Sequence, residues 1–515
     1  MLIVGLAVVL GVGYGAYLLI DSRLHADERR AAVETFTRAW AAGDHDAMYR
    51  LLDDDSRRAN PRVSFLAAYR RADRGAGVKK ITVGAAGPLL SGGYVNVPVN
   101  VQTRDFGTLR GTIRFHAVQT GDVARVSWEP SQVLPGLRRG EQVRRRLGAE
   151  PKRGTIYDAA DRVLDSDPTG ASIAGEAGDK PTGLQRIYND RLAGRRSATL
   201  RFGNRVVARI PGRKGRSVHT TIRLGLQKQA LSALGGKVGG VAVIKPSDGS
   251  VLALAGLAVS APQPPGSSFK IITAAAALAH GAAQPSSTYP VRQYATLSGV
   301  RLRNAGDEEC GGSLVTSFAH SCNSVFAPLG AKVGAKKLVD MAERFGFNEP
   351  FDIPAAKTNT IPAASELKDS LAVGSSAIGQ NKDQATPLGM ASVAATIANH
   401  GVRVRPHLAG TKRVRKRAVS AKVAGQVRDM MIAVVTSGTG TAAAIPGVTV
   451  AGKTGTAELV STADIAQNAK NTTAWFVAFA PAANPRVAVA VMLPNAGQGG
   501  ASAAPIAKRV LQAAL

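Results

Sequence analysis

The feature that most constrains the fold is the segment PPGSSFKIITAAAALAH, from Pro264 to His280. Its long apolar, alanine-rich run predicts a helix buried on all sides, which requires other elements packed around it. The same helix begins with a hydroxyl and an ammonium, Ser267 and Lys270, placed three residues apart. Side chains at this spacing share one helix face, with Cβ atoms ~5–6 Å apart. We therefore expect the hydroxyl of Ser267 and the amine of Lys270 to lie at the boundary of the apolar core.

Ser267 and Lys270 form a plausible nucleophile and base. A serine hydroxyl is a weak nucleophile and needs a base, and a lysine serves as that base only when burial or a second positive charge disfavours its ammonium form. The apolar helix predicts burial of Lys270, and the second charge must come from elsewhere in the fold. Another Ser-x-x-Lys match, Ser365 to Lys368, lies in a polar stretch and predicts a solvated surface pair.

The strand patterns around this helix predict a sheet assembled from both ends of one domain. The run GGVAVIKPSDGSVLALAG, residues 239–256, predicts a β-hairpin around a Pro-Ser-Asp-Gly turn. Strand patterns return in VTVAGKTGTAEL, TAWFVAFAP and RVAVAVMLP, and a last helix follows in AAPIAKRVLQAAL. We therefore expect an α/β domain over residues 236–515, with a central antiparallel sheet flanked by helices.

A second candidate group is Ser321-Cys322-Asn323, which begins 54 residues after Ser267. Alone, a Ser-x-Asn run is most simply a helix or turn cap.

A third candidate group, Lys453-Thr454-Gly455-Thr456, lies inside a strand pattern. Alone it is most simply a strand end. Combined with the serine, it predicts an ammonium and a hydroxyl at a sheet edge, where Lys453 and Thr454 receive a carboxylate. Lys453 also supplies the second charge, and Gly455 lets an extended substrate backbone approach and pair with the edge. The N–H groups of Thr456 and Ser267 would form an oxyanion hole.

The first part of the chain predicts an anchor and a small domain. Residues 1–22 include an uncharged run from Leu2 to Ile20, which at ~1.5 Å per residue reaches ~28 Å, close to a hydrocarbon core. A retained single span fits better than a cleaved signal peptide, because no convincing cleavage site follows. Arginines follow the span and none precedes it, so the positive-inside rule alone would leave the chain in the cytoplasm.

Two further regions precede the α/β domain. Residues 26–130 combine helices, with Val33, Phe36 and Trp40 on one face, and alternating strands, which predicts an α+β domain. Residues 131–235 are rich in Gly, Arg and Pro and predict a β-rich pedestal.

Charge and cysteine content leave alternatives open. The formal net charge of +29 suggests an anionic lipid, wall polymer or nucleic acid partner, or only an arginine-rich composition on solvated faces. No recognised nucleic-acid-binding fold appears, so nucleic acid is not expected.

Cys310 and Cys322 could pair across a turn or remain two buried thiols. No His or acid cluster with zinc spacing surrounds them, so no metal is expected.

The three motifs, in this order, are similar to those of class B penicillin-binding proteins, the monofunctional cell-wall D,D-transpeptidases. PPGSSFK, SCN and AGKTGTAE match the family motifs, and IGQNKDQATPLGMASVAATIANHG resembles a further family segment. KRGTIYD, TGLQRIYNDRLAG and TTIRLGLQ resemble its pedestal domain. Residues 26–130 resemble the nuclear-transport-factor-like domain of the methicillin-resistance type.

The resemblance implies a role for each site residue. Ser267 would be the acylated nucleophile and Lys270 its base, Ser321 would relay a proton, and Asn323 would hold the substrate amide. Lys453 and Thr454 would bind the terminal carboxylate. The chemistry would be attack on the penultimate D-Ala carbonyl of a stem peptide, loss of D-Ala, and transfer of the acyl group to a neighbouring amine. No cofactor is implied, and β-lactams would acylate the same serine.

The resemblance also implies a location and partners. The catalytic domain would lie outside the cytoplasm of a bacterium, held by a single membrane span, with peptidoglycan stem peptides as substrate and a polytopic glycan polymerase as partner. An oxidising location favours a Cys310–Cys322 disulfide over two thiols. The alternatives are a β-lactamase, a β-lactam sensor and a non-catalytic scaffold. The first would need a positioned carboxylate, the second further spans, and the third would tolerate broken motifs.

Overall fold

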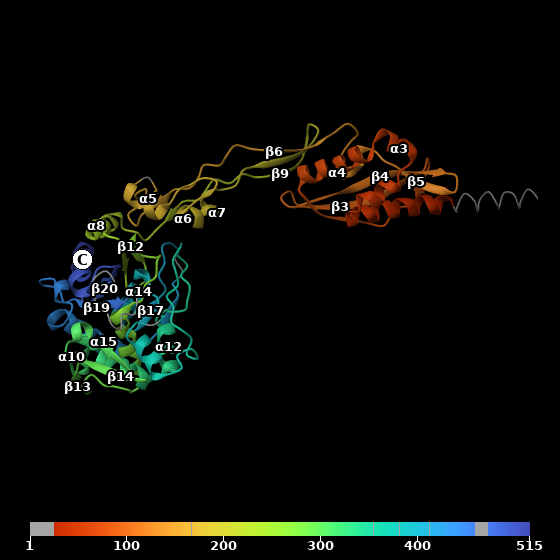
Figure 1. The fold of residues 1–515 in the computed structure, drawn as a ribbon. Helices are drawn as coiled ribbons and strands as arrows, with labels where there is room; N and C mark the ends of the chain where they lie inside the picture. Colours follow the sequence, from red (N-terminus) through yellow and green to blue (C-terminus); the bar gives the residue numbers. More distant parts are fainter. Residues whose placement is uncertain (1–24, 166, 354, 381, 411–412, 459–471) are drawn as a thin grey trace, which may run out of the picture. The chain divides into compact units, whose positions relative to one another are not determined.

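The computed structural model describes residues 25–515, except 166, 354, 381, 411–412 and 459–471 (Figure 1). The anchor predicted for residues 1–22 lies outside the described residues. In the part of the chain that is described, no helix combines the length and the apolarity that crossing a bilayer requires.

The chain divides into two compact units. The first extends to residue 152 and includes residues 193–215, and the second comprises residues 153–192 and 216–515. The region 131–235, which the sequence predicts to be one pedestal, therefore contributes residues to both units.

The first unit is built on a five-stranded antiparallel sheet with the order β1-β3-β4-β5, in which β2 pairs with β3. Every second residue of β3 from Val95 to Val101 is buried, as the alternating sequence predicts. Phe36 and Trp40, on a helix over residues 25–42, join these valines in one apolar cluster. The bounds are α2 His45–Arg50, α3 Asp54–Ala59, α4 Arg62–Ala76, β1 Val78–Val83, β2 Leu89–Leu90, β3 Tyr94–Thr103, β4 Thr108–Thr120, β5 Val123–Ser127 and the 3-10 turn η1 Pro130–Val133.

A second, three-stranded sheet completes the first unit. Its strands are β6 Val143–Leu147, β8 Ala198–Phe202 and β9 Arg205–Ile210, in the order β6-β8-β9. Leu200 and Phe202 of β8 are buried in the same apolar cluster as the helices of this unit. One face of this small sheet is therefore part of the core.

The second unit contains a five-stranded antiparallel sheet with the order β12-β11-β21-β20-β19. The first two strands come from the predicted hairpin, and the other three come from the end of the chain, which confirms the expected architecture. Along β20, Trp475 and Val477 enter one apolar cluster and Phe476 enters the other. Both faces of the sheet are covered, by α8 and α17 on one side and by α9 and α14 on the other, so most residues of its inner strands are apolar, whereas the edge strand β19 also carries Lys453 and Thr454.

The described helices and strands of the second unit have the following bounds: β7 Ile156–Tyr157, α5 Pro168–Ala174, α6 Gly183–Ile187, α7 Asn189–Leu192, β10 Val218–His219, α8 Leu224–Leu234, β11 Gly240–Ile244, β12 Val251–Gly256, η2 Gly266–Phe269, α9 Lys270–Ala279, β13 Thr288–Arg292, β14 Tyr294–Leu297, β15 Val300–Arg303, η3 Ala305–Asp307, β16 Cys310–Ser313, α10 Leu314–Ala319, α11 Asn323–Val333, α12 Ala335–Arg344, α13 Ser370–Ala377, α14 Pro387–Ala398, β17 Val402–Val404, β18 Arg415–Arg417, α15 Ala421–Ser437, η4 Thr441–Ala443, β19 Ala451–Glu458, β20 Thr472–Ala480, β21 Val487–Leu493, α16 Gly499–Ser502 and α17 Ala504–Ala514.

Helix α9 is the central helix that the sequence predicts. Every residue from Lys270 to Ala277 is buried, and α11, α12 and α15 pack around it. The amine of Lys270 is therefore carried into the core on an otherwise apolar helix.

Candidate active site

Ser267 lies on a tight turn in front of the central helix. The turn is the 3-10 helix η2, and the α-helix proper begins at Lys270. Gly266 adopts a positive φ of 51°, and its N–H donates to the carbonyl of Gly379 at 2.9 Å. A Cβ at Gly266 would lie 2.5 Å from the carbonyl oxygen of Thr456, closer than a side chain tolerates. Glycine is therefore required here, and it lets the turn press against strand β19.

Lys270 is completely buried. Its Nζ donates to the carbonyl of Ser321 at 2.6 Å, to the Asn323 Oδ1 at 2.7 Å and to the Ser321 Oγ at 3.3 Å. Burial first, and the charge of Lys453 second, hold the pKa of Lys270 well below its ordinary value. The amine thus has the two influences that a lysine base needs.

Ser321 lies between helices α10 and α11 with a left-handed φ of 63°, a backbone conformation uncommon outside glycine. This conformation turns both its carbonyl and its hydroxyl toward Lys270. The amide of Asn323 is oriented by a bond from Nδ2 to the carbonyl of Arg303 at 2.7 Å. Its Oδ1 therefore faces the lysine.

Lys453 is also completely buried, and it lies on β19, an edge strand of the five-stranded sheet. Its Nζ donates to the Ser321 Oγ at 2.9 Å and to the carbonyl of Thr454 at 3.0 Å. Burial lowers the pKa of Lys453 to about 7. The Ser321 hydroxyl therefore lies within hydrogen-bond distance of both lysine amines.

The edge strand lies close to the turn of Ser267 at Gly455. A Cβ at Gly455 would lie 2.8 Å from the carbonyl oxygen of Pro265 and 3.1 Å from the backbone nitrogen of Ser268. The missing side chain therefore makes room for the turn that carries Ser267, a role that the sequence did not suggest. The hydroxyl of Thr456 accepts a bond from the N–H of Gly499 at 3.4 Å.

The structure thus brings most of the predicted residues into one hydrogen-bonded network. That network contains Lys270, Ser321, Asn323, Lys453 and Thr454. Ser267 is half-buried on the adjoining turn, and its hydroxyl makes no hydrogen bond with any described residue. The second Ser-x-x-Lys match is solvent-exposed at both ends, which confirms its assignment as a surface pair.

Two residues of the site were not identified from the sequence. The Thr439 Oγ1 lies 2.6 Å from the Thr454 Oγ1 and 3.3 Å from the carbonyl of Ala319. The Asn304 side chain accepts from the N–H of Ser324 at 2.8 Å and holds the loop before α11. The sequence did contain a signal for Thr439, the run Ser-Gly-Thr-Gly at residues 437–440. Glycines in such a run allow another backbone segment to approach closely.

Asp383 is a buried acid near the nucleophile turn that the sequence did not single out. Burial raises its pKa well above the ordinary value, and the Ser376 hydroxyl lowers it in part. Its segment contacts the chain before Ser267 on both sides, through Gly379 with Gly266 and through Ala385 with Gln263. Asp383 is therefore part of the packing behind the turn.

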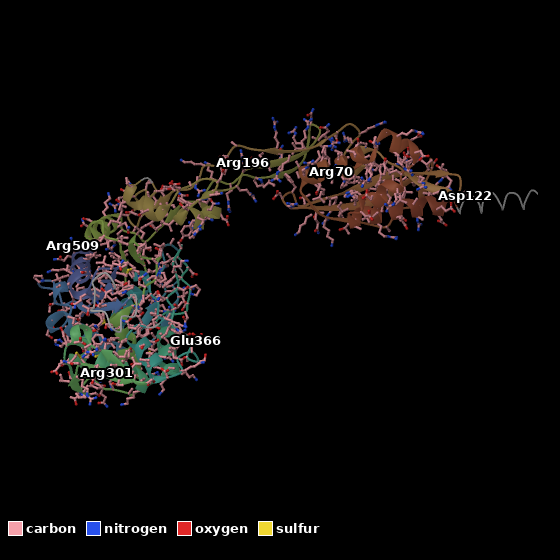
Figure 2. All side chains as sticks on the ribbon, in the orientation of Figure 1. Arg70, Asp122, Arg196, Arg301, Glu366 and Arg509 are labelled. Carbon is pink, nitrogen blue, oxygen red and sulfur yellow. A yellow bond between two sulfur atoms is a disulfide. The ribbon has the colours of Figure 1, made fainter. Side chains whose placement is uncertain are left out.

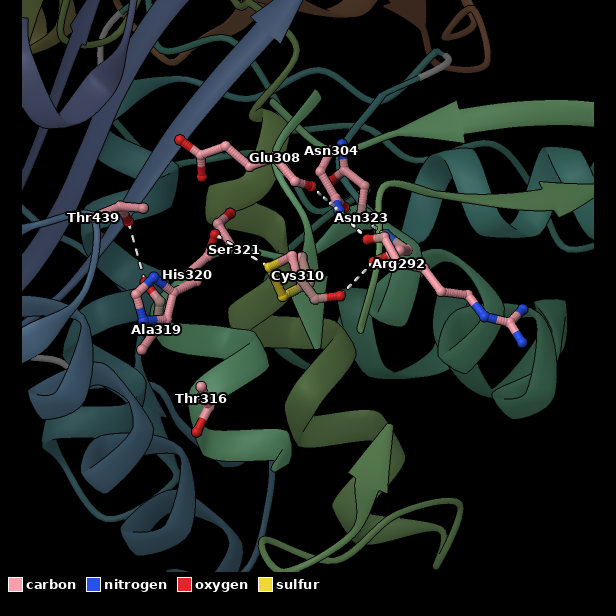
Figure 3. The surroundings of a disulfide bond; sticks show 12 residues. Arg292, Asn304, Glu308, Cys310, Thr316, Ala319, His320, Ser321, Asn323 and Thr439 are labelled. Carbon is pink, nitrogen blue, oxygen red and sulfur yellow. Dashed lines mark hydrogen bonds between the residues drawn. A yellow bond between two sulfur atoms is a disulfide. The ribbon is translucent and has the colours of Figure 1, made fainter. Parts of the chain in front are cut away.

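Cys310 and Cys322 form a disulfide with a Cα–Cα distance of 5.4 Å (Figure 3). The bond joins strand β16 to the residue between Ser321 and Asn323. Figure 3 shows both motif residues next to the two sulfur atoms, and Asn304 donating to the carbonyls of Arg292 and Glu308. The disulfide and the Asn304 bonds hold the same loop from two sides.

Two buried amines of lowered pKa bond to the Ser321 hydroxyl, and the adjoining turn carries a second serine hydroxyl, that of Ser267, which bonds to no described residue. This combination is suited to serine acyl transfer. The fold and the site together define this class of protein. A family model described as "Penicillin binding protein transpeptidase domain" matches residues 239–512. The chain therefore belongs to the penicillin-binding protein transpeptidase family.

Relatives agree with this membership. The peptidoglycan D,D-transpeptidase PbpA of Mycolicibacterium smegmatis is 36% identical over 409 residues, which cover 66% of this chain and 80% of that protein. The ceftriaxone acyl-enzyme of penicillin-binding protein A from Mycobacterium tuberculosis is 30% identical with a TM-score of 0.61, covering 71% of this chain and 99% of that chain. A D,D-transpeptidase domain from Eggerthella lenta gives 30% identity, a TM-score of 0.62 and the same coverage.

Proposed function

We propose that this protein is a peptidoglycan D,D-transpeptidase that cross-links stem peptides through an acyl-enzyme on Ser267 and binds penicillin at the same serine. The observation that carries the proposal is the placement of Ser321 between two buried lysines of lowered pKa, beside the turn of Ser267. In this proposal Lys270, which follows the Ser267 turn on the same helix, is the base, and Lys453 on the edge strand is the cation.

The first half of the reaction forms an ester. The Ser267 Oγ attacks the penultimate D-Ala carbonyl while Lys270 takes the hydroxyl proton. The developing oxyanion is stabilised by the N–H groups of Ser267 and Thr456. The C–N bond then breaks, Ser321 gives its hydroxyl proton to the leaving D-Ala amine, and Lys270 returns to Ser321 the proton that it took from Ser267. In the second half, a neighbouring peptide amine attacks the ester and forms the new amide bond as the ester C–O bond breaks. The proton that this amine loses is taken by Lys270 and returned to the Ser267 oxygen.

Substrate binding uses the remaining residues. Lys453 and Thr454 bind the terminal carboxylate of the donor peptide. The side-chain amide of Asn323 has two N–H donors and an oxygen with two lone pairs. Its bonds to Lys270 and Arg303 use one donor and one lone pair, and the remaining ones bind the substrate amide. No carboxylate among the described residues bonds to Lys270 or Lys453, which favours a lasting acyl-enzyme over the rapid hydrolysis of a β-lactamase.

We assign the remaining regions as follows. Residues 1–22 form a single membrane anchor that places the second unit outside the cytoplasm, where a polytopic glycan polymerase supplies the polymer. Residues 26–130 form a nuclear-transport-factor-like domain, supported by their helices packed on a twisted antiparallel sheet. Residues 131–235 form the pedestal, and residues 236–515 form the transpeptidase domain.

The proposal is tested with full-length protein in neutral detergent. Given a stem pentapeptide ending in D-Ala-D-Ala and a D-amino acid acceptor, the protein is expected to release D-Ala and form the exchanged peptide, followed by mass spectrometry. With penicillin, the intact mass should show a lasting adduct. Rapid penicillin hydrolysis without an adduct would instead identify a β-lactamase, and the absence of both products would identify a scaffold.

The acylation rate is expected to depend on pH through Lys453. The residue binds a carboxylate only when protonated, and its pKa of about 7 means that the cation is lost as pH rises through that value. The second-order rate constant for penicillin acylation, which reports the free enzyme, should therefore fall on the alkaline side of about pH 7. Lys453→Arg should remove this fall, because arginine stays charged. A wild-type rate that is constant from about pH 6 to 9 would contradict the prediction.

The disulfide is expected to support activity by holding the Ser321 loop. In Cys310→Ala/Cys322→Ala, stability should fall by roughly 2–4 kcal/mol, the usual effect of removing such a cross-link, and penicillin acylation should slow several-fold. Reductant should slow the wild type toward the variant and leave the variant unchanged. Equal acylation rates in wild type and variant would show that the loop holds its position without the bond.

A further inference from the structure

The small sheet of the first unit carries four arginines on one face. In its register Arg144 lies opposite Arg201, and Arg146 lies opposite Thr199. Thr199 in turn lies opposite Arg209 on the next strand. Because side chains alternate across a strand, Arg144, Arg146, Arg201 and Arg209 point to the same side. We call these four residues the arginine face; Figure 2 shows the side chains of this stretch around the labelled Arg196.

The arginines on the opposite side of the same sheet have partners. Arg145 pairs with Asp105 at 2.7 Å, and its guanidinium lies 5.4 Å from the centre of the Phe106 ring. Arg205 pairs with Glu141 at 2.6 Å and lowers the pKa of that carboxyl to about 2. On this side each arginine is balanced by an acid.

The arginine face has no such balance. None of its four members forms an ion pair with any described residue; Arg144 donates to the amide oxygen of Gln142 at 3.3 Å, and Arg201 donates to the carbonyl of Asn204. Arg144, Arg146 and Arg209 are exposed. Like charges directly opposite each other across a sheet are destabilising. An arginine-rich composition accounts for the number of arginines. It does not account for one face of the sheet whose arginines form ion pairs and another whose arginines form none.

We propose that the arginine face binds a linear phosphodiester polymer. In a β-sheet, neighbouring strands lie ~4.8 Å apart and residues two apart on one strand lie ~6.8 Å apart. The arginines therefore start from a regular set of backbone positions, which suits a polymer whose negative charges also repeat. All four side chains are arginines, whose planar forks bind phosphate oxygens in pairs. The face contains Thr199 and Val206 between the arginines and no aromatic anchor, whereas binding to a bilayer surface uses large apolar side chains.

The test measures binding of a fluorescently labelled poly(glycerol phosphate) to the full-length protein in neutral detergent, by anisotropy at several salt concentrations. The variant carries Arg144→Gln, Arg146→Gln, Arg201→Gln and Arg209→Gln. Its affinity should fall at least about tenfold at low salt, and its slope of log affinity against log salt should be shallower by about 3, since each phosphate contact contributes about 0.7. The control removes the same charge from exposed positions of the second unit, with Arg186→Gln, Lys336→Gln, Lys337→Gln and Arg344→Gln.

Each outcome decides the proposal. Loss of binding in the test variant but not in the control supports it, provided that both variants keep the unfolding temperature of the wild type. Equal losses in both variants would show that only net charge attracts the polymer, and the proposal would fail. It would also fail if the wild type bound no polymer, or if the four arginines were needed for binding to phosphatidylglycerol micelles and not to the polymer.

Discussion

Ser267→Ala is expected to abolish covalent labelling by a fluorescent penicillin. The acyl group is carried by the Ser267 Oγ, and no other hydroxyl lies on the exposed side of the same turn. Removing a serine nucleophile lowers the rate of acyl transfer by up to about 10⁶-fold. Labelling should therefore drop below detection on a denaturing gel, and mass spectrometry should find no adduct.

The matched control is Ser268→Ala, one residue further along the turn. Ser268 is completely buried, and its hydroxyl donates to the carbonyl of Pro265 at 2.7 Å. Losing this bond should cost stability of about 1 kcal/mol and leave labelling in place. Labelling that survives in Ser267→Ala, or disappears equally in both variants, would refute the assignment of Ser267.

Lys270→Met is expected to slow penicillin acylation by about 10²–10⁴-fold, the usual contribution of a general base. Methionine fills a similar volume in the core but cannot accept the proton of Ser267. The rate constant should be measured by stopped-flow or quenched labelling over time. Lys368→Met, the same change in the exposed Ser-x-x-Lys match, is the control and should react at the wild-type rate.

A stability measurement separates this loss from unfolding. The pKa of Lys270 is lower in the folded protein than in the unfolded chain, so the unfolded chain binds more protons as pH falls below about 10.4. Wild type should therefore lose stability relative to Lys270→Met as the pH falls from about 9.5 to 7. A variant that is inactive but whose unfolding temperature shows no such relative change would indicate that Lys270 keeps its charge, which would contradict its role as base.

The local elements of the fold were predictable from the sequence. The alternation of β3, the Pro-Ser-Asp-Gly hairpin and the apolar run of α9 each follow from periodicities of two or 3.6 residues, which depend on covalent neighbours. The start of α9 differs in detail, because the sequence predicts one helix from Ser267 and the structure has a 3-10 turn before the α-helix begins at Lys270. The strand and helix bounds confirm the predictions for β3, the hairpin and α9.

The site itself was predictable only as three separate motifs. Their spacing along the chain says nothing about which atoms meet. The structure places the Ser321 hydroxyl within reach of both lysines and adds Thr439, whose contact with Thr454 joins residues from two elements. It also gives Gly455 a role in the packing of the nucleophile turn.

The sequence by itself determined which segments become helices and strands, and which residue types are available for chemistry. Only the tertiary structure decided that strand β19 packs against the turn of Ser267, and that burial, first, and the charge of Lys453, second, lower the pKa of Lys270 as the sequence had led us to expect. The reason is physical: a pKa depends on burial and on charges a few ångströms away, and those neighbours come from segments separated by 51 and 132 residues along the chain.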